Sequence, residues 1–485
     1  MPTNLDIPAL VSDLEDAVGQ SHVLHAPEDL LAYEYDATID RHTPDAVVFP
    51  ATTEEVAAVV RIAERHKTPI VPRGSGTGLA GGALAVLGGV LCVMTRMNRI
   101  VEVDGKNRLA VIEPGVINLA LQDAAAKHGL TYAPDPSSQR VCTIGGNVAT
   151  NSGGPHTLAH GSTVNHVLGV EVVLPGGRIT WLGGRQLDTP GPDLRGLFVG
   201  SEGTLGIVTK VCVRLIRMQQ AVRTMLAIFE TIDDASAAVS AVIRRGVIPV
   251  AMEMLDHEII VAVEQTMHVG YPLDAGAVLL IEVEGIHEAV ASDALEVVAA
   301  CEEHNAREIR VADEEAEREK LWEGRKAGIG ALGSVSPNFY LLDGVVPRTR
   351  LPEVMRGVLE LSASYGFKCA NIFHAGDGNL HPNIMFDELE EGATERVLDL
   401  GGEIMRLCVD AGGSITGEHG VGLEKRSYMD WIFDPPDIEA MERIKVAFGT
   451  DELFNPCKIL PTGRGCGQAH EAEIRRHFTT LDVYA

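Results

Sequence analysis

The stretch VPRGSGTGLAGGA, residues 71–83, starts at the end of the apolar run TPIV and is the most informative part of the chain for its architecture. Every residue from Gly74 to Gly78 is glycine, serine or threonine, so the backbone N–H groups are free to converge on an anion. The stretch lacks the Gly-Lys-Ser/Thr ending of a P-loop and the βαβ setting of a Rossmann fingerprint. Taken alone, it indicates either a sterically tight turn or an anion-binding loop.

Two further loops of similar composition favour the ligand-binding interpretation. PDPSSQRVCTIGGNVATNSGG covers residues 134–154, and FVGSEGTLGIVT covers residues 198–209. Each is rich in glycine and small polar residues and borders a predicted strand. Three such loops together can enclose a long ligand that carries a pyrophosphate and a polar ring.

The bulk composition describes a soluble chain of more than one domain. With 485 residues, 45% of them apolar and 22% charged, the chain is expected to form two or three domains. Its formal net charge of −28 argues against nucleic acid or an anionic membrane surface as partner. No run approaches the roughly 20 apolar residues of a membrane span, and MPTNLDIPAL does not resemble a signal peptide, so we expect a cytoplasmic protein.

The cysteines indicate no metal cluster. The chain has 8 of them, scattered and without any CxxC pair, so we expect reduced and mostly buried thiols. An iron–sulfur centre is bound by grouped cysteine thiolates, which this chain does not offer.

The order of predicted elements divides the chain into an α/β part and an α+β part. DAVVFPATTEEVAAVVRIAERHKTPIVPRG, residues 45–74, predicts a strand, a threonine-capped helix and a second strand. A second α/β unit is expected over residues 101–215. After about residue 218, segments such as MLAIFETIDDASAAVSAVIRRG repeat a strand followed by an amphipathic helix. That repeat favours an antiparallel sheet with helices on one face.

Two polar motifs in the second half of the chain are candidates for chemistry. HAGDGNLH, residues 374–381, places His374 and His381 on either side of a segment with strong turn chemistry, and GEHG, residues 417–420, offers Glu418 beside His419. A strand–turn–strand arrangement would bring the two imidazoles together, and with Glu418 they would form a divalent-metal site with open positions. The alternative at this point is two structural histidines beside a glycine turn.

The loops and these motifs together resemble a known flavoprotein superfamily. Over residues 20–460 the chain resembles the vanillyl-alcohol oxidase, or PCMH-type, flavoproteins. Its C-terminal motifs are similar to those of their D-2-hydroxy-acid dehydrogenases, and above all to the flavin-bearing subunits of bacterial glycolate oxidases. The resemblance implies an α+β fold, in which a two-subdomain PCMH-type FAD-binding domain is joined to a ferredoxin-like substrate or cap domain.

The implied domain limits follow from the same resemblance. We expect an N-terminal helical segment over residues 1–41, the FAD-binding domain over 42–218 and the cap domain over 219–410. Residues 411–485, which carry GEHG, are expected to return to the FAD-binding domain and pack on it.

The resemblance also implies how FAD is bound. The pyrophosphate is expected on residues 73–78, the isoalloxazine near 134–138, 145–147 and 151–154, and the adenine side near 202–203 and 207–208. Relatives with covalent flavin commonly carry a histidine where this chain has Thr77, so we expect dissociable, non-covalent FAD. The residues expected to contact it are Pro72, Arg73, Gly74, Ser75, Gly76, Thr77, Gly78, Gly81, Gly82, Pro134, Asp135, Pro136, Ser137, Ser138, Gly145, Gly146, Asn147, Thr150, Asn151, Gly153, Gly154, Glu202, Gly203, Ile207 and Val208.

The metal and the general base are implied in the same way. His374, His381 and Glu418 match the zinc ligands of D-2-hydroxyglutarate and D-lactate dehydrogenases, although such a donor set also tolerates Mn²⁺ or Fe²⁺. His419 is the expected general base, since an ordinary imidazole pKa suits proton abstraction near neutral pH. The alternative is that His419 is a third histidine ligand.

The substrate residues combine a match to these dehydrogenases with one departure. Arg325 matches the arginine that binds the substrate carboxylate, as its bidentate fork allows, the alternative being an ordinary surface charge. Asn383 is expected as a polar pocket residue and Lys425 as a weaker candidate. Where the hydroxyglutarate enzymes carry a threonine and a lysine for a distal carboxylate, this chain has Ile329 and Leu341. The pocket is therefore expected to take a short monocarboxylate.

The expected activity is the FAD-dependent oxidation of a short D-2-hydroxy acid, glycolate to glyoxylate first and D-lactate to pyruvate second. The alternatives are a stand-alone D-lactate dehydrogenase and then a D-2-hydroxyglutarate dehydrogenase. An inactive flavin-binding scaffold would be expected to lose HAGDGNLH and GEHG, and a metal hydrolase would leave the three glycine loops unexplained.

The electron acceptor is the remaining expectation. The resemblance implies a second FAD-domain subunit and an iron–sulfur subunit, which could also hold the protein at the inner membrane. A self-sufficient enzyme that reduces a quinone or cytochrome is equally compatible with the sequence.

Overall fold

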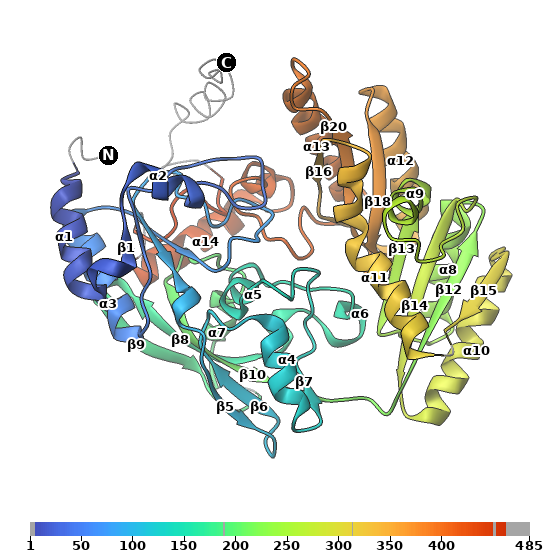
Figure 1. Ribbon diagram of the computed structural model, residues 1–485, viewed down its shortest axis with the longest axis horizontal. Coiled ribbons are helices and arrows are strands. Elements are labelled where there is room, and N and C mark those ends of the chain that lie inside the picture. Colours follow the sequence, from blue (N-terminus) through green and yellow to red (C-terminus); the bar gives the residue numbers. More distant parts are fainter. Residues whose placement is uncertain (1–4, 188–189, 313, 450–452, 462–485) are drawn as a thin grey trace.

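The chain folds into two lobes, each built on its own sheets (Figure 1). The computed structural model describes residues 5–187, 190–312, 314–449 and 453–461. The first lobe contains the elements up to β11, and the second contains those from β12 to α13. The chain then returns to the first lobe with α14 (Pro435–Phe448) (Figure 1).

The first lobe begins with a small sheet in the order β1-β2-β4-β3, made by Val23–Leu24, Ala46–Val48, Val90–Val93 and Ile70–Arg73. Strands β2, β4 and β3 are parallel, and helices α1 (Ile7–Val18) and α3 (Thr53–His66) share a core with them. The Thr52 hydroxyl accepts a hydrogen bond from the Glu55 N–H at 3.1 Å, so the predicted threonine cap is confirmed. The glycine loop of residues 74–78 leaves the end of β3.

A second sheet of the first lobe is antiparallel throughout, in the order β5-β6-β10-β8-β9. Its strands are Ile100–Asp104, Leu109–Ile112, Ile207–Arg214, Val167–Leu174 and Arg178–Gly183. The loop of residues 134–154 contains the short helix α5, which the Thr143 hydroxyl caps by accepting from the Gly146 N–H. The remaining elements of this lobe are α2 (Pro27–Leu30), α4 (Asn118–Ala126), β7 (Leu130–Thr131), α5 (Ile144–Thr150), α6 (Thr157–His160), α7 (Leu194–Phe198) and β11 (Ile216–Arg217).

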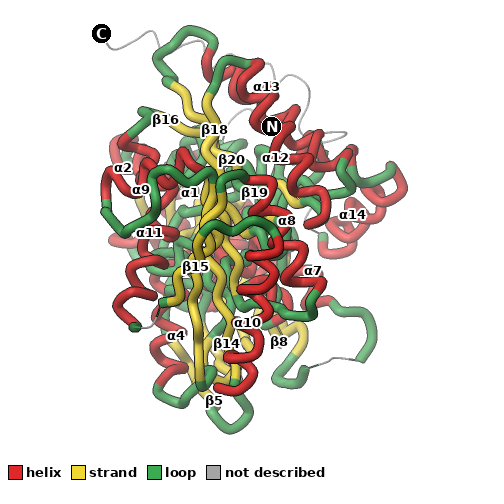
Figure 2. The backbone as a smooth tube through the Cα atoms, turned by 90° about the vertical axis from the view of Figure 1, so that its right-hand side faces the viewer, coloured by secondary structure: helices red, strands yellow, loops and turns green. Residues whose placement is uncertain are grey.

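The second lobe is an antiparallel sheet, in the order β15-β12-β14-β13-β18-β19-β17, with β20 and β16 continuing from β18. Figure 2 shows the molecule turned by 90° from Figure 1, so that the second lobe faces the viewer. Its strands are β12 (Ala221–Phe229), β13 (Ala251–Asp256), β14 (Ala277–Gly285), β15 (Glu308–Val311), β16 (Asn338–Leu341), β17 (Gly344–Val345), β18 (Lys368–His374), β19 (Asn379–Leu380) and β20 (Pro382–Phe386). Its helices are α8 (Ile232–Arg244), α9 (His257–Thr266), α10 (His287–Glu303), α11 (Glu315–Ala331), α12 (Leu351–Ser364) and α13 (Ala393–Asp410).

The expectation that helices cover one face of this sheet is wrong. Side chains of α8, α10, α12 and α13 share a core with Met225 and Ala227, whereas those of α9 and α11 share a core with Leu226 and Ile228. Successive residues of a strand point to opposite faces, so the helices cover both. The strand sequences are apolar at nearly every position, which burial on both faces requires.

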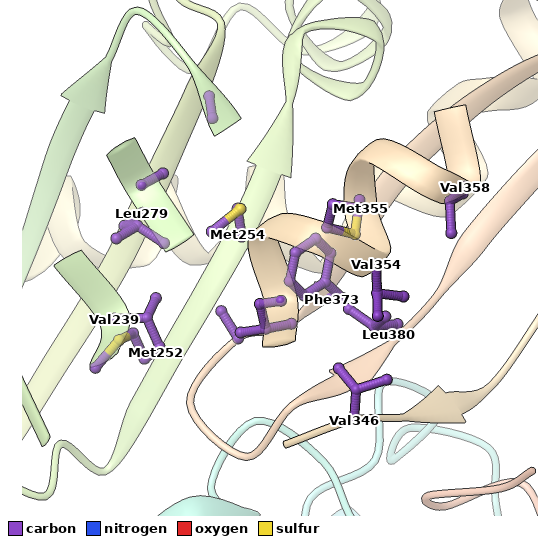
Figure 3. Close-up of a cluster of buried hydrophobic side chains, with 14 of the residues drawn as sticks. Val239, Met252, Met254, Leu279, Val346, Val354, Met355, Val358, Phe373 and Leu380 are labelled. Carbon is purple, nitrogen blue, oxygen red and sulfur yellow. The ribbon is translucent and has the colours of Figure 1, made fainter. Parts of the chain in front are cut away.

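The alternation along β13 and β18 positions two polar side chains. Met252 and Met254 of β13 lie in the core with Phe373 of β18 (Figure 3). Glu253 and His374 therefore point to the opposite face, and they are directly paired across the two strands.

After α13 the chain returns to the first lobe and joins its small sheet. Phe454 forms a parallel bridge with Ile70, and the Asn455 amide donates to the carbonyls of Gly82 and Glu202 at 2.8 and 2.6 Å. The Lys458 ammonium donates to the Leu84 carbonyl at 2.8 Å. Residues 1–4, 450–452 and 462–485 of the predicted terminal segments lie outside the described residues, and the predicted domain limits stay a prediction.

The cysteine expectation holds only in part. The free and buried cysteines are Cys92, Cys142, Cys212, Cys301, Cys369 and Cys408. Cys457 is disulfide-bonded, so the expectation of uniformly reduced thiols is wrong there, and Cys466 lies outside the described residues. None of the described helices combines the length and apolar character that crossing a membrane requires.

Candidate active site

One long cavity runs between the three glycine-rich loops and reaches the second lobe. The predicted FAD residues that line it are Pro72, Arg73, Gly74, Ser75, Gly76, Thr77, Gly78, Gly82, Pro136, Ser137, Ser138, Gly145, Gly146, Asn147, Thr150, Glu202, Gly203, Ile207 and Val208. Gly81, Pro134, Asp135, Asn151, Gly153 and Gly154 are not part of its lining. Residues that the sequence did not single out also line it, among them Met94, Pro114, Thr143 and Phe198.

Arg73 provides a cationic group where the glycine loop of residues 74–78 lines the cavity. Its side chain is buried, and Nη1 has no hydrogen-bond partner among the described residues. The loop folds closely around it: at Gly76, where φ is +75°, a Cβ would lie 2.1 Å from Arg73 Nη2. A buried guanidinium above a loop of free N–H groups fits the diphosphate of a dinucleotide.

Glu418 and His419 of the GEHG segment line the same cavity, and the residues that follow them contact the first lobe. The Leu423 N–H donates to the Ala80 carbonyl at 2.8 Å, and a Cβ on Gly422 would lie 1.8 Å from that oxygen. The Glu202 carboxylate accepts from the N–H groups of Val421 and Gly422 at 2.8 and 3.0 Å. Burial raises the pKa of Glu202, and these backbone hydrogen bonds oppose that effect.

His374, His381 and Glu418 come together as a possible metal-ligand set. The Nε2 atoms of both histidines lie 3.2 Å from Glu418 Oε1, and one ligand atom from each of the three lies within 4.8 Å of the others. Glu418 Oε2 is buried and has no hydrogen-bond partner in the described part of the chain. Such convergence of imidazole nitrogens on a carboxylate fits a divalent cation.

The far side of each imidazole is fixed by an acceptor. His374 Nδ1 lies 2.8 and 2.9 Å from the two carboxylate oxygens of Glu253, and His381 Nδ1 lies 3.2 Å from the Leu342 carbonyl. With Nδ1–H donating to these acceptors, Nε2 is the nitrogen of each ring that faces Glu418 and can bind a metal ion. Burial lowers the pKa of His374, but the charges of Glu253 and Glu418 outweigh it and raise that pKa well above its ordinary value.

His419 lies over His381 and lines the cavity. The two rings are stacked, with centroids 5.1 Å apart and 9° between their planes. Burial lowers the pKa of His419 to about 4, although the charge of Asp343 opposes it, so the imidazole is neutral near pH 7. The expectation of an ordinary imidazole pKa at His419 is therefore wrong. His419 Nδ1 lies 3.9 Å from Asp343 Oδ2. Asp343, His381 and His419 form a second group of side chains that could hold a metal ion.

The Asp343 carboxylate binds the backbone of the GEHG segment, and Lys425 is the counter-ion of Asp343. The Asp343 carboxylate accepts from the Thr416 hydroxyl at 2.6 Å and from the N–H groups of Gly417 and His419 at 3.1 and 3.0 Å. Lys425 Nζ lies 3.0 Å from the same carboxylate and is almost fully buried. Lys425, predicted as a substrate residue, is not part of the cavity lining.

Arg325 of α11 lines the cavity but is not a surface charge, being only 2% exposed. Its Nε and Nη2 lie 2.7 and 2.5 Å from Glu253 Oε2. Ile329, one helical turn later, and Leu341 of β16 line the cavity as well. Asn383, predicted as a pocket residue, is buried outside the lining and donates to the carbonyls of Ala370 and His381.

Sequence reasoning missed Glu253 and Asp343. Each is fully buried, with no exposed surface, in a strand-like context of apolar neighbours, as in VAMEMLD and YLLDGVV. An isolated acidic residue in an apolar strand is the signal that could have found them, because a buried carboxylate needs a partner.

Comparison with known proteins identifies the family of this chain. Residues 44–183 match the family described as FAD binding domain, and residues 218–459 match FAD linked oxidases, C-terminal domain. The chain belongs to the FAD-linked oxidases. Its fold is of the PCMH type, as the sequence predicted, and FAD is its cofactor.

Curated relatives of this FAD-linked oxidase extend over almost its whole length. It is 44% identical to Glycolate oxidase subunit GlcD of Escherichia coli (strain K12), over 96% of this chain and 93% of that protein. It is 41% identical to the protein of the same name from Bacillus subtilis (strain 168), over 88% and 92% of the two chains. It is 34% identical to D-lactate dehydrogenase of Anaerostipes hadrus, over 86% and 89%.

Solved structures bear out the predicted fold. p-Cresol methylhydroxylase with substrate bound has a TM-score of 0.79 at 17% identity, over 94% of this chain and 97% of that one. 4-Ethylphenol oxidase from Gulosibacter chungangensis has a TM-score of 0.76 at 19% identity, over 95% and 98%.

Proposed function

We propose that this FAD-linked oxidase oxidises glycolate to glyoxylate, with D-lactate as a second substrate that gives pyruvate. The observation that carries the proposal is the shared cavity, which a buried arginine, a neutral histidine, and His381 and Glu418 of the His₂Glu group line together with the glycine-rich loops. The GlcD relatives and the D-lactate dehydrogenase relative support the choice of a short 2-hydroxy acid.

In this proposal Arg325 binds the substrate carboxylate and His419 takes the hydroxyl proton. The Nδ1 side of His419 faces Asp343, so Nε2 is the nitrogen that accepts the proton. When bound, FAD supplies the acceptor for the hydride that leaves the α-carbon. A divalent cation on His374, His381 and Glu418 would supply Lewis-acid polarisation of the hydroxyl. We favour zinc because the donors are two imidazoles and one carboxylate.

The charges of the site favour a substrate with one carboxylate. Arg325 and Glu253 cancel each other, as do Lys425 and Asp343. Glu418 with a divalent cation then leaves one net positive charge, which a monocarboxylate neutralises. A second carboxylate would lie unpaired against Ile329 and Leu341, and burying an unpaired charge is costly.

The remaining parts of the proposal concern the cofactor's attachment and the electron acceptor. Thr77 offers no nucleophile for a covalent bond, so we propose dissociable FAD. Electrons would leave through a second FAD-domain subunit and an iron–sulfur subunit, which could hold the protein at the inner membrane from the cytoplasmic side. Iron–sulfur absorbance in a natively purified complex would support these partners, and full turnover by the isolated chain with a quinone would contradict them.

The first experiment mixes the purified protein anaerobically with glycolate, D-lactate, L-lactate or D-2-hydroxyglutarate and follows flavin absorbance near ~450 nm. We expect rapid bleaching by glycolate and slower bleaching by D-lactate. Faster bleaching by D-lactate would favour a D-lactate dehydrogenase, and bleaching by none of the four would contradict a 2-hydroxy-acid oxidase.

Variants of the site test the assigned roles in the same assay. His419→Gln should slow flavin reduction by about 10²- to 10⁴-fold, the usual contribution of a general base, while FAD stays bound. Glu418→Gln should abolish reduction and metal binding together. An active Glu418→Gln variant would contradict the metal site, and His128→Gln, an exposed change, is the control.

A further inference from the structure

Glu253 is a fully buried carboxylate that contacts two residues of different proposed roles. Its Oε2 atom lies 2.7 and 2.5 Å from Arg325 Nε and Nη2, and 2.9 Å from His374 Nδ1. Its Oε1 atom lies 2.8 Å from the same His374 nitrogen. One side chain therefore joins the proposed carboxylate-binding residue to a proposed metal ligand.

The fold places the Glu253 side chain between His374 and Arg325. It is the direct cross-strand neighbour of His374, on the face of the sheet that α11 covers, and α11 carries Arg325. All three side chains are at most 4% exposed, so water does not substitute for these contacts. In a buried setting such charge-assisted hydrogen bonds define the orientation of both partners.

The contacts fix what each partner presents to the cavity. His374 donates its Nδ1–H to Glu253, which leaves Nε2, 3.2 Å from Glu418 Oε1, as the nitrogen available to a metal ion. Arg325 has Nε and Nη2 engaged, and no hydrogen bond of Nη1 is found within the described residues, which leaves that edge of the guanidinium for a ligand.

We propose that Glu253 is a positioning residue that sets both the tautomer of His374 for metal binding and the orientation of Arg325 for the substrate carboxylate. The inference rests on the proposed function for its substrate half only. The metal half concerns residues of this chain and can be measured without turnover.

The informative substitution is Glu253→Gln, which keeps the size of the side chain but replaces one of its two acceptor oxygens by an NH₂ group. A glutamine has one acceptor oxygen, and Arg325 and His374 both need to donate to it. With the oxygen in the Oε2 position, Arg325 keeps its acceptor, but the NH₂ lies in the Oε1 position, 2.8 Å from His374 Nδ1, where it opposes the Nδ1–H and favours the tautomer whose Nε2 carries the proton. The reverse orientation places NH₂ against the guanidinium donors, so a glutamine cannot serve both partners as the carboxylate does.

The test measures zinc affinity and substrate kinetics on FAD-loaded protein. We expect Glu253→Gln to bind Zn²⁺ about 10- to 100-fold more weakly and to show a raised KM for glycolate, with unchanged FAD content. Glu253→Asp keeps the charge and should recover part of the zinc affinity, but it is too short to contact both partners, so its KM stays raised. Glu171→Gln, which removes another buried, cation-paired carboxylate, should leave both measurements unchanged.

The outcomes separate this inference from the proposed function. Wild-type zinc affinity and KM in a folded Glu253→Gln variant would overturn it, as would wild-type values of both in Glu253→Asp if the glutamine variant does not fold. If no 2-hydroxy acid reduces the wild-type flavin, the proposed function fails, while the ratio of zinc affinities still decides the metal half. A wild type that binds no Zn²⁺ overturns the inference together with the metal site.

Discussion

Ile329 and Leu341 are apolar residues of the candidate active-site cavity. Both line it together with Arg325, and neither offers a polar atom for a second carboxylate. Because discrimination between acids that differ by one methyl group is worth only about 1–3 kcal/mol, glycolate and D-lactate are both expected to fit. A dicarboxylate is a different case, since its second charge needs a partner.

The double change Ile329→Thr and Leu341→Lys should therefore redirect specificity. A buried lysine facing the distal carboxylate supplies a charge-assisted hydrogen bond of about 1.5–3 kcal/mol. We expect kcat/KM for D-2-hydroxyglutarate to rise at least about tenfold and that for glycolate to fall. Leu341→Met is the uncharged control, and an unchanged ratio of the two kcat/KM values in the double variant would contradict the role of these positions.

The residues with recognisable motifs could be predicted, whereas those supporting them could not. HAGDGNLH and GEHG carry their chemistry in a short run of letters, and the structure brings His374, His381 and Glu418 within contact of one another. Glu253 acquires its role only from the register of β13 against β18, which no local pattern encodes. The role of Lys425 could not be predicted for a similar reason, because its partner Asp343 lies far away in the sequence.

At the scale of elements, α6 and β14 are linked by two histidine–carboxylate contacts between the lobes. His160 Nε2 lies 2.7 Å from Glu284 Oε1, while His156, just before α6, lies 2.8 Å from Asp135 and 3.8 Å from Glu282. Burial lowers the pKa of His156, but the charges of Asp135 and Glu282 outweigh it and raise that pKa to about 10. The link therefore carries a protonated imidazole at neutral pH.

This raised pKa predicts a pH dependence of stability. Since the folded pKa lies above the unfolded value, the stabilisation is fully present below about pH 6.5 and is lost as the pH rises through about 10. With a side chain 29% exposed, screening should limit the effect to about 1–2 kcal/mol. The urea midpoint of the wild type should therefore fall more between pH 7 and pH 10 than that of His156→Gln. Equal falls in the two proteins would contradict the assignment.

The order of elements was predictable where periodicity is strong, and their layering was not. The strands and helices expected over 45–74 and 225–246 are all present. The nearly all-apolar strands fit two covered faces, but they do not say which helices cover which face. That depends on α9 and α11, which pack back across the sheet after their strands.

At the scale of the whole molecule, the second lobe interrupts the first. The chain leaves the first lobe after β11 and forms the second lobe. It then returns through α14 to the bridge between Phe454 and Ile70. Phe454 is fully buried in the core of the small sheet, from which the glycine loop extends. The architecture of the FAD site therefore depends on two segments that are far apart in the sequence.

Removing the Phe454 side chain should weaken both the fold and the retention of FAD. A buried Phe→Ala change typically costs about 3–5 kcal/mol, here in the core directly under β3. We expect Phe454→Ala to lower the urea midpoint and to release FAD on gel filtration. Val446→Ala, at a position 62% exposed on α14, should change neither, and full FAD retention in Phe454→Ala would contradict this dependence.

The same return segment has a consequence for synthesis. A ribosome makes the glycine loop of residues 74–78, then the entire second lobe, and only afterwards Asn455, whose amide donates to the carbonyls of both Gly82 and Glu202. A nascent chain therefore carries its glycine loops for most of translation without the contacts that close them. We therefore expect FAD to bind late in synthesis, and a chain that stops within the second lobe to hold flavin poorly.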